Sequence, residues 1–124
     1  MIIGIGTDII KISRIEKAKR ELGDMFLDKI FTEKEKAYCE EHKSASCYAA
    51  RFAAKEAVAK ALGLGFEKEL SWKNVEIINN QKGKPFVSFS GKITDKTKNY
   101  SCHISLSHCT DYATATSIIE LKCF

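Results

Sequence analysis

An alanine-rich segment in the middle of the chain constrains the fold more than any other feature. Residues 44–62 consist mostly of residues that favour a helix, and Gly63 follows directly, where a glycine commonly ends one. Because most of these side chains are small and apolar, we expect one long helix that is largely buried. The remaining elements must then pack around this helix.

Shorter elements flank the predicted helix on both sides. Two Ser/Thr-x-x-Glu patterns, Ser13 to Glu16 and Thr32 to Glu35, are capping boxes that predict helices ending near Gly23 and His42. Apolar runs and alternating patterns predict strands at residues 2–8, 72–79, 85–89, 102–108 and 113–121. The turn-forming residues between the second and third strands predict a hairpin. We therefore expect an α+β fold, with a largely antiparallel sheet of about five strands packed with one long and two or more short helices.

Length and composition fit a single domain over residues 1–124. The chain has 124 residues, of which 44% are hydrophobic and 29% are charged, an ordinary globular composition with enough length for one core. No apolar run reaches the roughly 20 residues that a membrane-spanning helix needs. The first ten residues also lack the basic start of a signal peptide. We expect a cytoplasmic protein that does not act on membranes.

The net charge is concentrated in one short segment. Five basic residues and one acidic residue lie between positions 9 and 20, which accounts for the whole net charge of +4. Such a local patch attracts an anionic partner, but it is too small to indicate general binding of nucleic acid. A solvent-exposed helix face without a partner is the alternative interpretation.

The five cysteines show no pattern typical of a metal site or a redox motif. They stand at positions 39, 47, 102, 109 and 123, with no Cys-x-x-Cys pair and no Cys/His zinc spacing. Because the count is odd and a cytoplasmic location is expected, we predict reduced, partly buried thiols.

Two carboxylates stand out from their surroundings. Asp8 ends an apolar strand, and Glu56 lies on the same face of the long helix as Lys60, one turn later. A Glu/Lys pair at this spacing is often only a weak surface ion pair. In a buried helix, however, a carboxylate needs a cation or hydrogen-bond donors. Two carboxylates together are able to hold Mg²⁺ with water and phosphate oxygens, although the sequence does not show that Asp8 and Glu56 meet.

Several small motifs favour contacts with an anion or a phosphate. Ser107 and His108 end a predicted strand in the pattern Ser-x-Ser-His, whose spacing does not fit a serine-hydrolase triad. Lys84 lies on the hairpin turn in the sequence Gly-Lys-Pro, which is not a nucleotide-binding Walker motif. Gly63 and Gly65 follow the long helix and favour close backbone approach.

Taken together and in order, these segments resemble a known family. They are GIGTDI at 4–9, FTEKE at 31–35, RFAAKEAVAKALG at 51–63, GKP at 83–85 and SLSH at 105–108. The chain looks like holo-acyl-carrier-protein synthase, the small bacterial class of 4′-phosphopantetheinyl transferases. The resemblance implies transfer of the phosphopantetheine arm of coenzyme A to a serine of apo-acyl carrier protein, in support of fatty acid biosynthesis.

The resemblance also implies roles for individual residues. Asp8 and Glu56 would bind Mg²⁺, for which Mn²⁺ substitutes, with Glu56 favoured as the base and Lys60 beside the departing phosphate. Coenzyme A would contact the end of the long helix, the GKP turn and the SLSH strand end, at Gly63, Gly65, Lys84, Pro85, Ser107 and His108. The acidic carrier protein would bind the first helix and its neighbours, at Arg14, Lys17, Arg20, Met25 and Phe26. The family further implies a homotrimer with its sites at subunit interfaces.

Two other functions are alternatives to this transfer. A Mg²⁺-dependent phosphohydrolase would share Asp8, Glu56 and Lys60 but pass the group to water. A non-enzymatic module that binds acidic proteins through residues 11–20 would need none of the three.

Overall fold

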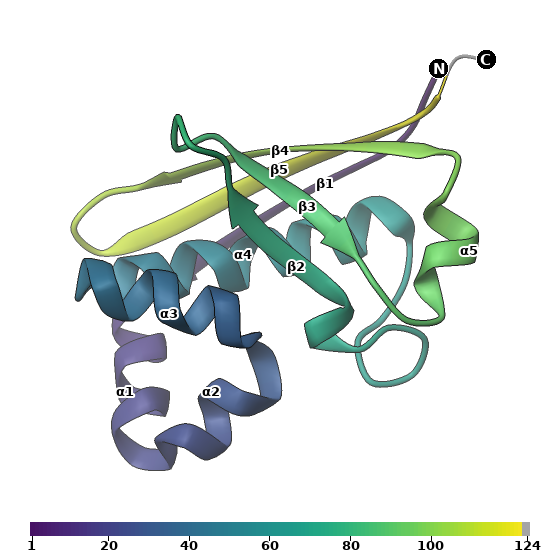
Figure 1. Cartoon of the computed structure of the whole chain (residues 1–124). Coiled ribbons are helices and arrows are strands. Elements are labelled where there is room, and N and C mark those ends of the chain that lie inside the picture. Colours follow the sequence, from purple (N-terminus) through teal and green to yellow (C-terminus); the bar gives the residue numbers. More distant parts are fainter. Residues whose placement is uncertain (123–124) are drawn as a thin grey trace.

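The computed structural model describes residues 1–122 and confirms the predicted α+β class. The elements in chain order are β1 (Ile2–Lys11), α1 (Ile12–Leu22), α2 (Asp24–Ile30), α3 (Glu33–His42), α4 (Ala45–Leu62), the 3-10 turn η1 (Trp72–Asn74), β2 (Val75–Asn79), β3 (Pro85–Phe89), α5 (Ile93–Thr97), β4 (Tyr100–His108) and β5 (Tyr112–Leu121). The strands form two antiparallel sheets, one with the order β1-β5-β4 and one that is the β2-β3 hairpin. Figure 1 shows α4 lying beneath the long sheet, with α1, α2 and α3 gathered towards one end.

Two glycines bring the first strand unusually close to the long helix. A Cβ atom added at Gly4 would lie 2.0 Å from the carbonyl oxygen of Ala61, and one added at Gly6 would lie 1.9 Å from that of Ala57. Any side chain at these two positions would therefore push β1 away from α4. This contact holds the first half of β1 in a fixed position relative to the C-terminal part of α4.

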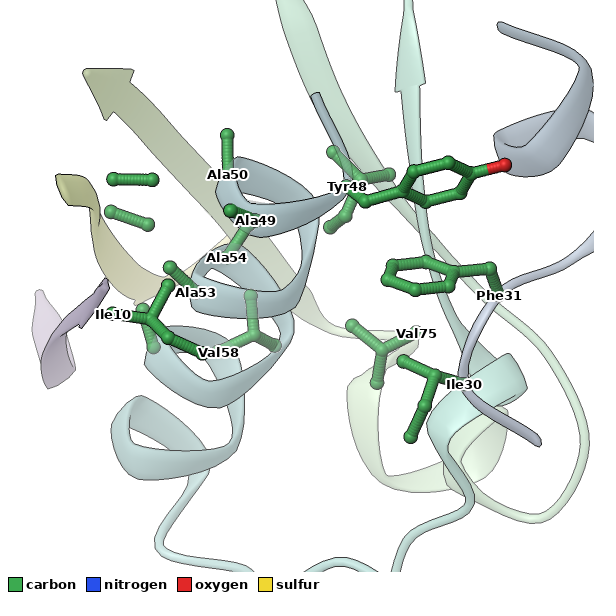
Figure 2. Close-up of a cluster of buried hydrophobic side chains, with 14 of the residues drawn as sticks. Ile10, Ile30, Phe31, Tyr48, Ala49, Ala50, Ala53, Ala54, Val58 and Val75 are labelled. Atoms are coloured by element: carbon green, nitrogen blue, oxygen red, sulfur yellow. The ribbon is translucent and has the colours of Figure 1, made fainter. Parts of the chain in front are cut away.

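The core extends from both sides of α4. Small residues of the helix, including Ala53 and Ala57, are fully buried where it packs close to the sheet. On its other side, Phe31 and Tyr48 pack with ring centroids 5.0 Å apart, close to Val75 of the hairpin (Figure 2). Burying each large apolar side chain of this kind contributes about 1.5–3 kcal/mol.

A buried ion pair joins the long helix to the elements around it. The Lys55 ammonium lies 2.9 Å from Glu35 and also donates to the backbone carbonyls of Trp72 and Val75. Glu35 in turn accepts hydrogen bonds from the backbone N–H groups of Thr32 and Ile77. Burial lowers the pKa of Lys55, an effect that the carboxylate of Glu35 opposes. Breaking such a pair leaves an uncompensated charge in the core, so this contact holds α3, α4 and β2 together.

Helix boundaries follow the predictions except at the first helix. Thr32 forms the predicted capping box with Glu35, and Ser44 caps α4, which ends at Gly63 with a left-handed φ of 72°. The predicted capping box at Ser13 is wrong, because α1 starts at Ile12 directly after β1. The Ile12 N–H group donates to the carbonyl of Asp111, so the first turn does not need a side-chain cap.

The predicted strand at residues 72–79 is confirmed only from Val75 onward. Residues 72–74 form a 3-10 turn, because Lys55 binds the carbonyl of Trp72 and the indole stacks on Phe52 and Phe66. These contacts hold the backbone away from an extended conformation.

The prediction that all cysteines are reduced is wrong for one pair. Cys39 and Cys47 form a disulfide, since the turn between α3 and α4 brings their Cα atoms within 5.4 Å. Cys102 and Cys109 are free thiols, and Cys123 lies outside the described residues. Within residues 1–122, no helix has the length and apolar character needed to cross a membrane.

Candidate active site

The packing of β1 on α4 brings Asp8 and Lys60 into contact. The Lys60 ammonium lies 3.1 Å from Asp8 Oδ1 and donates to the carbonyl of Thr7 at 3.0 Å. The Asp8 side chain is only 17% exposed, whereas that of Lys60 is 54% exposed. The pair therefore joins a nearly buried carboxylate to a cation that faces solvent.

Glu56 is a third charged residue beside the ion pair of Asp8 and Lys60. It lies one turn before Lys60 on α4 and is half-buried. Burial raises the pKa of Glu56, the negative charge of Asp8 raises it further, and the Lys60 ammonium opposes both effects. The two carboxylates thus interact electrostatically, which the sequence alone did not show. We call Asp8, Glu56 and Lys60 the carboxylate cluster.

The carboxylate cluster has the chemistry of a small magnesium site. Within the described residues, no group of three or more His, Cys, Asp or Glu side chains is arranged to hold a metal. Mg²⁺ commonly uses only one or two carboxylates and completes its shell with water and substrate phosphates. A divalent cation would also remove the repulsion that raises the pKa of Glu56. Asp8 and Glu56 therefore fit Mg²⁺ bound together with a phosphate ligand.

The predicted coenzyme A residues do not gather in one pocket of a single chain. Gly63 and Gly65 are exposed just beyond the end of α4. Lys84 and Pro85 line a pocket of about 390 Å³ between the hairpin turn and the middle of β4. That pocket contains Ser105 but none of the carboxylate cluster. Ser107 and His108 are exposed at the end of β4.

His108 instead shares a pocket with a residue that the sequence analysis missed. Arg51 of α4 is only 4% exposed, yet it lines a pocket of about 370 Å³ together with His108. Its guanidinium lies over the Tyr38 ring, 4.2 Å from the centroid, and donates to Asn79. Its Nε atom is buried and has no hydrogen-bond partner among residues 1–122. We call this space the Arg51 pocket.

The position of Arg51 within the long helix gave a partial indication of the Arg51 pocket. A buried arginine requires an anion or several acceptors, and Arg51 stands among alanines in the sequence. Its relation to His108 depends on the fold, because β4 comes more than forty residues later in the chain. The pocket was therefore not predictable from sequence spacing.

The basic segment forms an exposed surface, as its charge pattern predicted. Arg14, Lys17 and Arg20 are exposed on α1, whose buried face carries Ile12 and Ile15. On the adjacent α2, Met25 is 76% exposed and Phe26 is half-buried. Basic and apolar groups thus lie on neighbouring helices.

Comparison with known proteins identifies the family. The family model described as the 4′-phosphopantetheinyl transferase superfamily matches residues 4–117. The holo-[acyl-carrier-protein] synthase of Protochlamydia amoebophila is 47% identical over 119 residues, which covers 95% of this chain and 98% of that protein. The synthase of Chlamydia muridarum is also 47% identical over 119 residues, covering 95% of this chain and 94% of that protein.

Solved structures agree with the sequence comparison. The holo-[acyl-carrier-protein] synthase of Helicobacter pylori, in complex with coenzyme A, has a TM-score of 0.86 at 34% identity and covers 94% of this chain and 99% of that chain. The holo-(acyl-carrier-protein) synthase of Bacillus anthracis, in complex with CoA (3′,5′-ADP), has a TM-score of 0.84 at 38% identity, and the match covers 98% of this chain and 99% of that chain. Because the matches in sequence and in structure both cover nearly the whole chain, it belongs to the holo-[acyl-carrier-protein] synthases of the 4′-phosphopantetheinyl transferase superfamily.

Proposed function

We propose that this protein transfers the 4′-phosphopantetheine arm of coenzyme A to a serine of an apo-acyl carrier protein and releases adenosine 3′,5′-bisphosphate. Family membership supports the reaction, and the observation that carries it in this chain is the carboxylate cluster at the contact of β1 and α4. Phosphoryl transfer depends mainly on positioning and charge stabilisation. The carboxylate cluster supplies both, because it gathers one cation and two carboxylates at the same contact.

Asp8 and Glu56 would hold Mg²⁺, or Mn²⁺ in its place, together with the pyrophosphate of coenzyme A. When bound, the ion supplies charge neutralisation at the phosphorus under attack. Asp8 is held for this role by Lys60 and by its position on β1. Gly63 and Gly65, just past the end of α4, would leave room for the pantetheine arm beside the cluster.

Glu56 would accept the proton of the carrier serine, directly or through a water molecule. Glu56 is the half-buried carboxylate of the cluster and lies on the same face of α4 as Lys60, one turn earlier. Lys60 extends from the same face of α4 and would stabilise the negative charge that develops on the departing phosphate.

The Arg51 pocket would bind a second phosphate of coenzyme A. Arg51 has a buried Nε without a partner, and His108 lies in the same pocket. An anion in this pocket would satisfy the unpaired donor. Lys84, Pro85 and Ser107, on the nearby turn and strand end, would contribute further contacts to the nucleotide.

We also propose that the active protein is a homotrimer with shared sites. Within one chain, the two pockets that carry proposed coenzyme A residues contain none of the carboxylate cluster, and a second copy would bring these pockets to the cluster of its neighbour. Ile5 and Ile9 on β1 are 68% and 66% exposed, on the sheet face that points away from α4. Exposed apolar residues in such a row favour association with another copy.

The carrier protein would bind the surface formed by α1 and α2. Arg14, Lys17 and Arg20 would attract its acidic surface, and Met25 and Phe26 would add apolar contacts.

The proposed site is tested with Asp8→Ala and Glu56→Ala in a transfer assay. Both variants should retain the circular dichroism spectrum of the wild type and lose transfer at saturating Mg²⁺. Normal turnover by either variant would show that the carboxylate cluster is not the site. Release of the bisphosphate by the wild type without carrier modification would instead identify a phosphohydrolase.

A further inference from the structure

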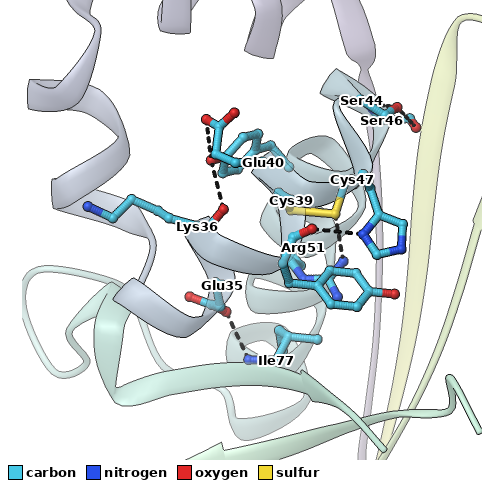
Figure 3. Close-up of a disulfide and its surroundings, with 12 residues drawn as sticks. Glu35, Lys36, Cys39, Glu40, Ser44, Ser46, Cys47, Arg51 and Ile77 are labelled. Atoms are coloured by element: carbon cyan, nitrogen blue, oxygen red, sulfur yellow. Dashed lines mark hydrogen bonds between the residues drawn. A yellow bond between two sulfur atoms is a disulfide. The ribbon is translucent and has the colours of Figure 1, made fainter. Parts of the chain in front are cut away.

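The disulfide stands in the wall of the Arg51 pocket. It joins Cys39 near the end of α3 to Cys47 in the first turn of α4 (Figure 3). The two sulfurs differ in access, because Cys39 is 1% exposed whereas Cys47 is half-buried and lines the pocket. A small thiol entering the pocket would reach the sulfur of Cys47 before that of Cys39.

The surroundings of Cys47 favour a reactive thiolate. The Arg51 guanidinium donates to Cys47 Sγ at 3.3 Å. Cys47 also lies in the N-terminal turn of α4, three residues after the capping Ser44. Both a neighbouring guanidinium and a helix N-terminus stabilise the anionic sulfur, which is the form that attacks and leaves in thiol–disulfide exchange.

Arg51 connects the disulfide to the proposed ligand contacts. Its second terminal nitrogen donates to Asn79, and the Asn79 side chain donates to the carbonyl of Gly83 at 2.9 Å. Gly83 precedes Lys84 on the hairpin turn. Direct hydrogen bonds thus connect Cys47 to the guanidinium and, through Asn79, to the hairpin turn.

We propose that Cys39 and Cys47 form a reversible thiol–disulfide site that controls how strongly the Arg51 pocket binds a phosphate-bearing ligand. This inference rests on the proposed function, since coenzyme A and adenosine 3′,5′-bisphosphate are the ligands concerned. In reducing compartments, protein disulfides are commonly transient and act in catalysis or sensing.

The redox partner is a low-molecular-weight thiol. Its thiolate attacks Cys47 Sγ, the bond between the two protein sulfurs breaks, and Cys39 leaves as a thiolate that takes up a proton. A second thiolate then attacks the sulfur of the small molecule in the mixed disulfide and releases Cys47. Two small thiols are oxidised to one small disulfide, and the protein gains two electrons. Cys39 takes up one of the two protons released, and the other goes to solvent because Cys47 stays a thiolate beside the Arg51 guanidinium.

The charge on Cys47 sets the direction of the effect. The oxidised pair is neutral and leaves the positive charge of Arg51 available to a phosphate. A reduced Cys47 thiolate pairs with the guanidinium and repels an anion. The other titratable groups that line the pocket are Tyr38, His42 and His108. One added negative charge at the pocket wall predicts about three- to tenfold weaker binding of the bisphosphate.

The experiment uses the full-length protein in two redox states. One sample is treated with oxidised glutathione and the other with dithiothreitol, and the small molecules are then removed. Alkylation followed by peptide mass mapping reports the state of Cys39 and Cys47. Calorimetry then measures the affinity for adenosine 3′,5′-bisphosphate, which has no thiol and does not exchange with the protein.

The expected result is tighter binding by the oxidised protein, with the difference reversed by dithiothreitol. The double variant Cys39→Ser/Cys47→Ser should bind equally under both treatments, and Cys109→Ser should respond as the wild type does. Equal affinity in two verified redox states would overturn the inference, as would two cysteines that stay open to alkylation after oxidation. If the double variant is unstable, the wild type still tests the inference, because dithiothreitol should reverse its difference in affinity.

A transfer assay on the same samples separates this inference from the proposed function. Modification of the carrier at equal rates and with equal KM for coenzyme A in both states would reject the redox control and retain the transferase. Absence of transfer and of bisphosphate binding in both states would reject both.

Discussion

Lys60 of the long helix and Asp8 of the first strand form an ion pair, with 3.1 Å between Lys60 Nζ and Asp8 Oδ1. The same ammonium binds the carbonyl of Thr7, so it contacts both the backbone and the side chain of β1. The geometry depends on how closely β1 packs against α4. It also places Glu56 where the charge of Asp8 influences its protonation.

Gly6→Ala tests the dependence of the site on this packing. The new Cβ would lie 1.9 Å from the carbonyl oxygen of Ala57, so β1 must shift away from α4. We expect a loss of about 1–3 kcal/mol in the free energy of unfolding, measured in urea, together with reduced transfer. Gly65→Ala is the matched control, because no atom lies within 4 Å of its added Cβ, and its stability should change by less than about 0.5 kcal/mol. Equal stability of Gly6→Ala and the wild type would contradict the role of this contact.

Glu56→Gln tests the raised pKa of the glutamate in metal-free protein. Because the folded state holds the Glu56 proton to higher pH than the unfolded chain, the wild type loses stability as pH rises from the usual carboxyl pKa through the raised value. The neutral glutamine avoids this loss. In EDTA, thermal denaturation should show the variant melting above the wild type at pH 8, with the difference shrinking towards pH 4. A variant that melts lower at pH 8 would mean that the charged carboxylate is stabilised in the fold.

Arg14→Glu tests the basic surface of α1. The charge reversal should weaken binding of the apo-carrier by about three- to tenfold at low salt and leave bisphosphate binding unchanged. The effect should decrease as salt is added, because surface charges are screened. Lys96→Glu makes the same charge change on exposed α5 and serves as the control. Equal weakening by both variants would indicate a general charge effect rather than a docking surface.

The free thiols of Cys102 and Cys109 should differ in reactivity. Burial raises the pKa of Cys102, and the hydroxyl of Ser117 only partly offsets this, whereas Cys109 is exposed. Iodoacetamide at pH 8 should therefore label Cys109 well before Cys102, as followed by peptide mass mapping. Labelling of Cys102 first would show that the β4-β5 contact opens readily.

Local sequence patterns predicted the start of a helix correctly where neighbouring side chains accept hydrogen bonds from its free backbone N–H groups. Thr32 and Glu35 cap each other within one turn, so their spacing alone identified the start of α3. The same pattern at Ser13 failed, because the carbonyl of Asp111, distant in sequence, binds the first N–H of α1. Gly4 and Gly6 were visible in the sequence, but their close packing against the backbone of α4 depends on the path of that helix.

The candidate site was predicted only in part for a similar reason. Asp8, Glu56 and Lys60 drew attention as charges among apolar neighbours. The structure pairs Lys60 with Asp8, and the charge of Asp8 contributes to the raised pKa of Glu56. The disulfide of Cys39 and Cys47 was missed because the angle between α3 and α4 decides whether the two sulfurs meet. Arg51 was missed because the residues that surround it come from α3, α4, β2 and β4.

The most direct test of the proposed reaction is the intact mass of an apo-acyl carrier protein after incubation with this protein, coenzyme A and Mg²⁺. The carrier should gain the mass of one phosphopantetheine, and one adenosine 3′,5′-bisphosphate should be released for each carrier modified. EDTA should abolish both changes. A carrier of unchanged mass while the bisphosphate accumulates, or a gain that EDTA does not affect, would contradict the account.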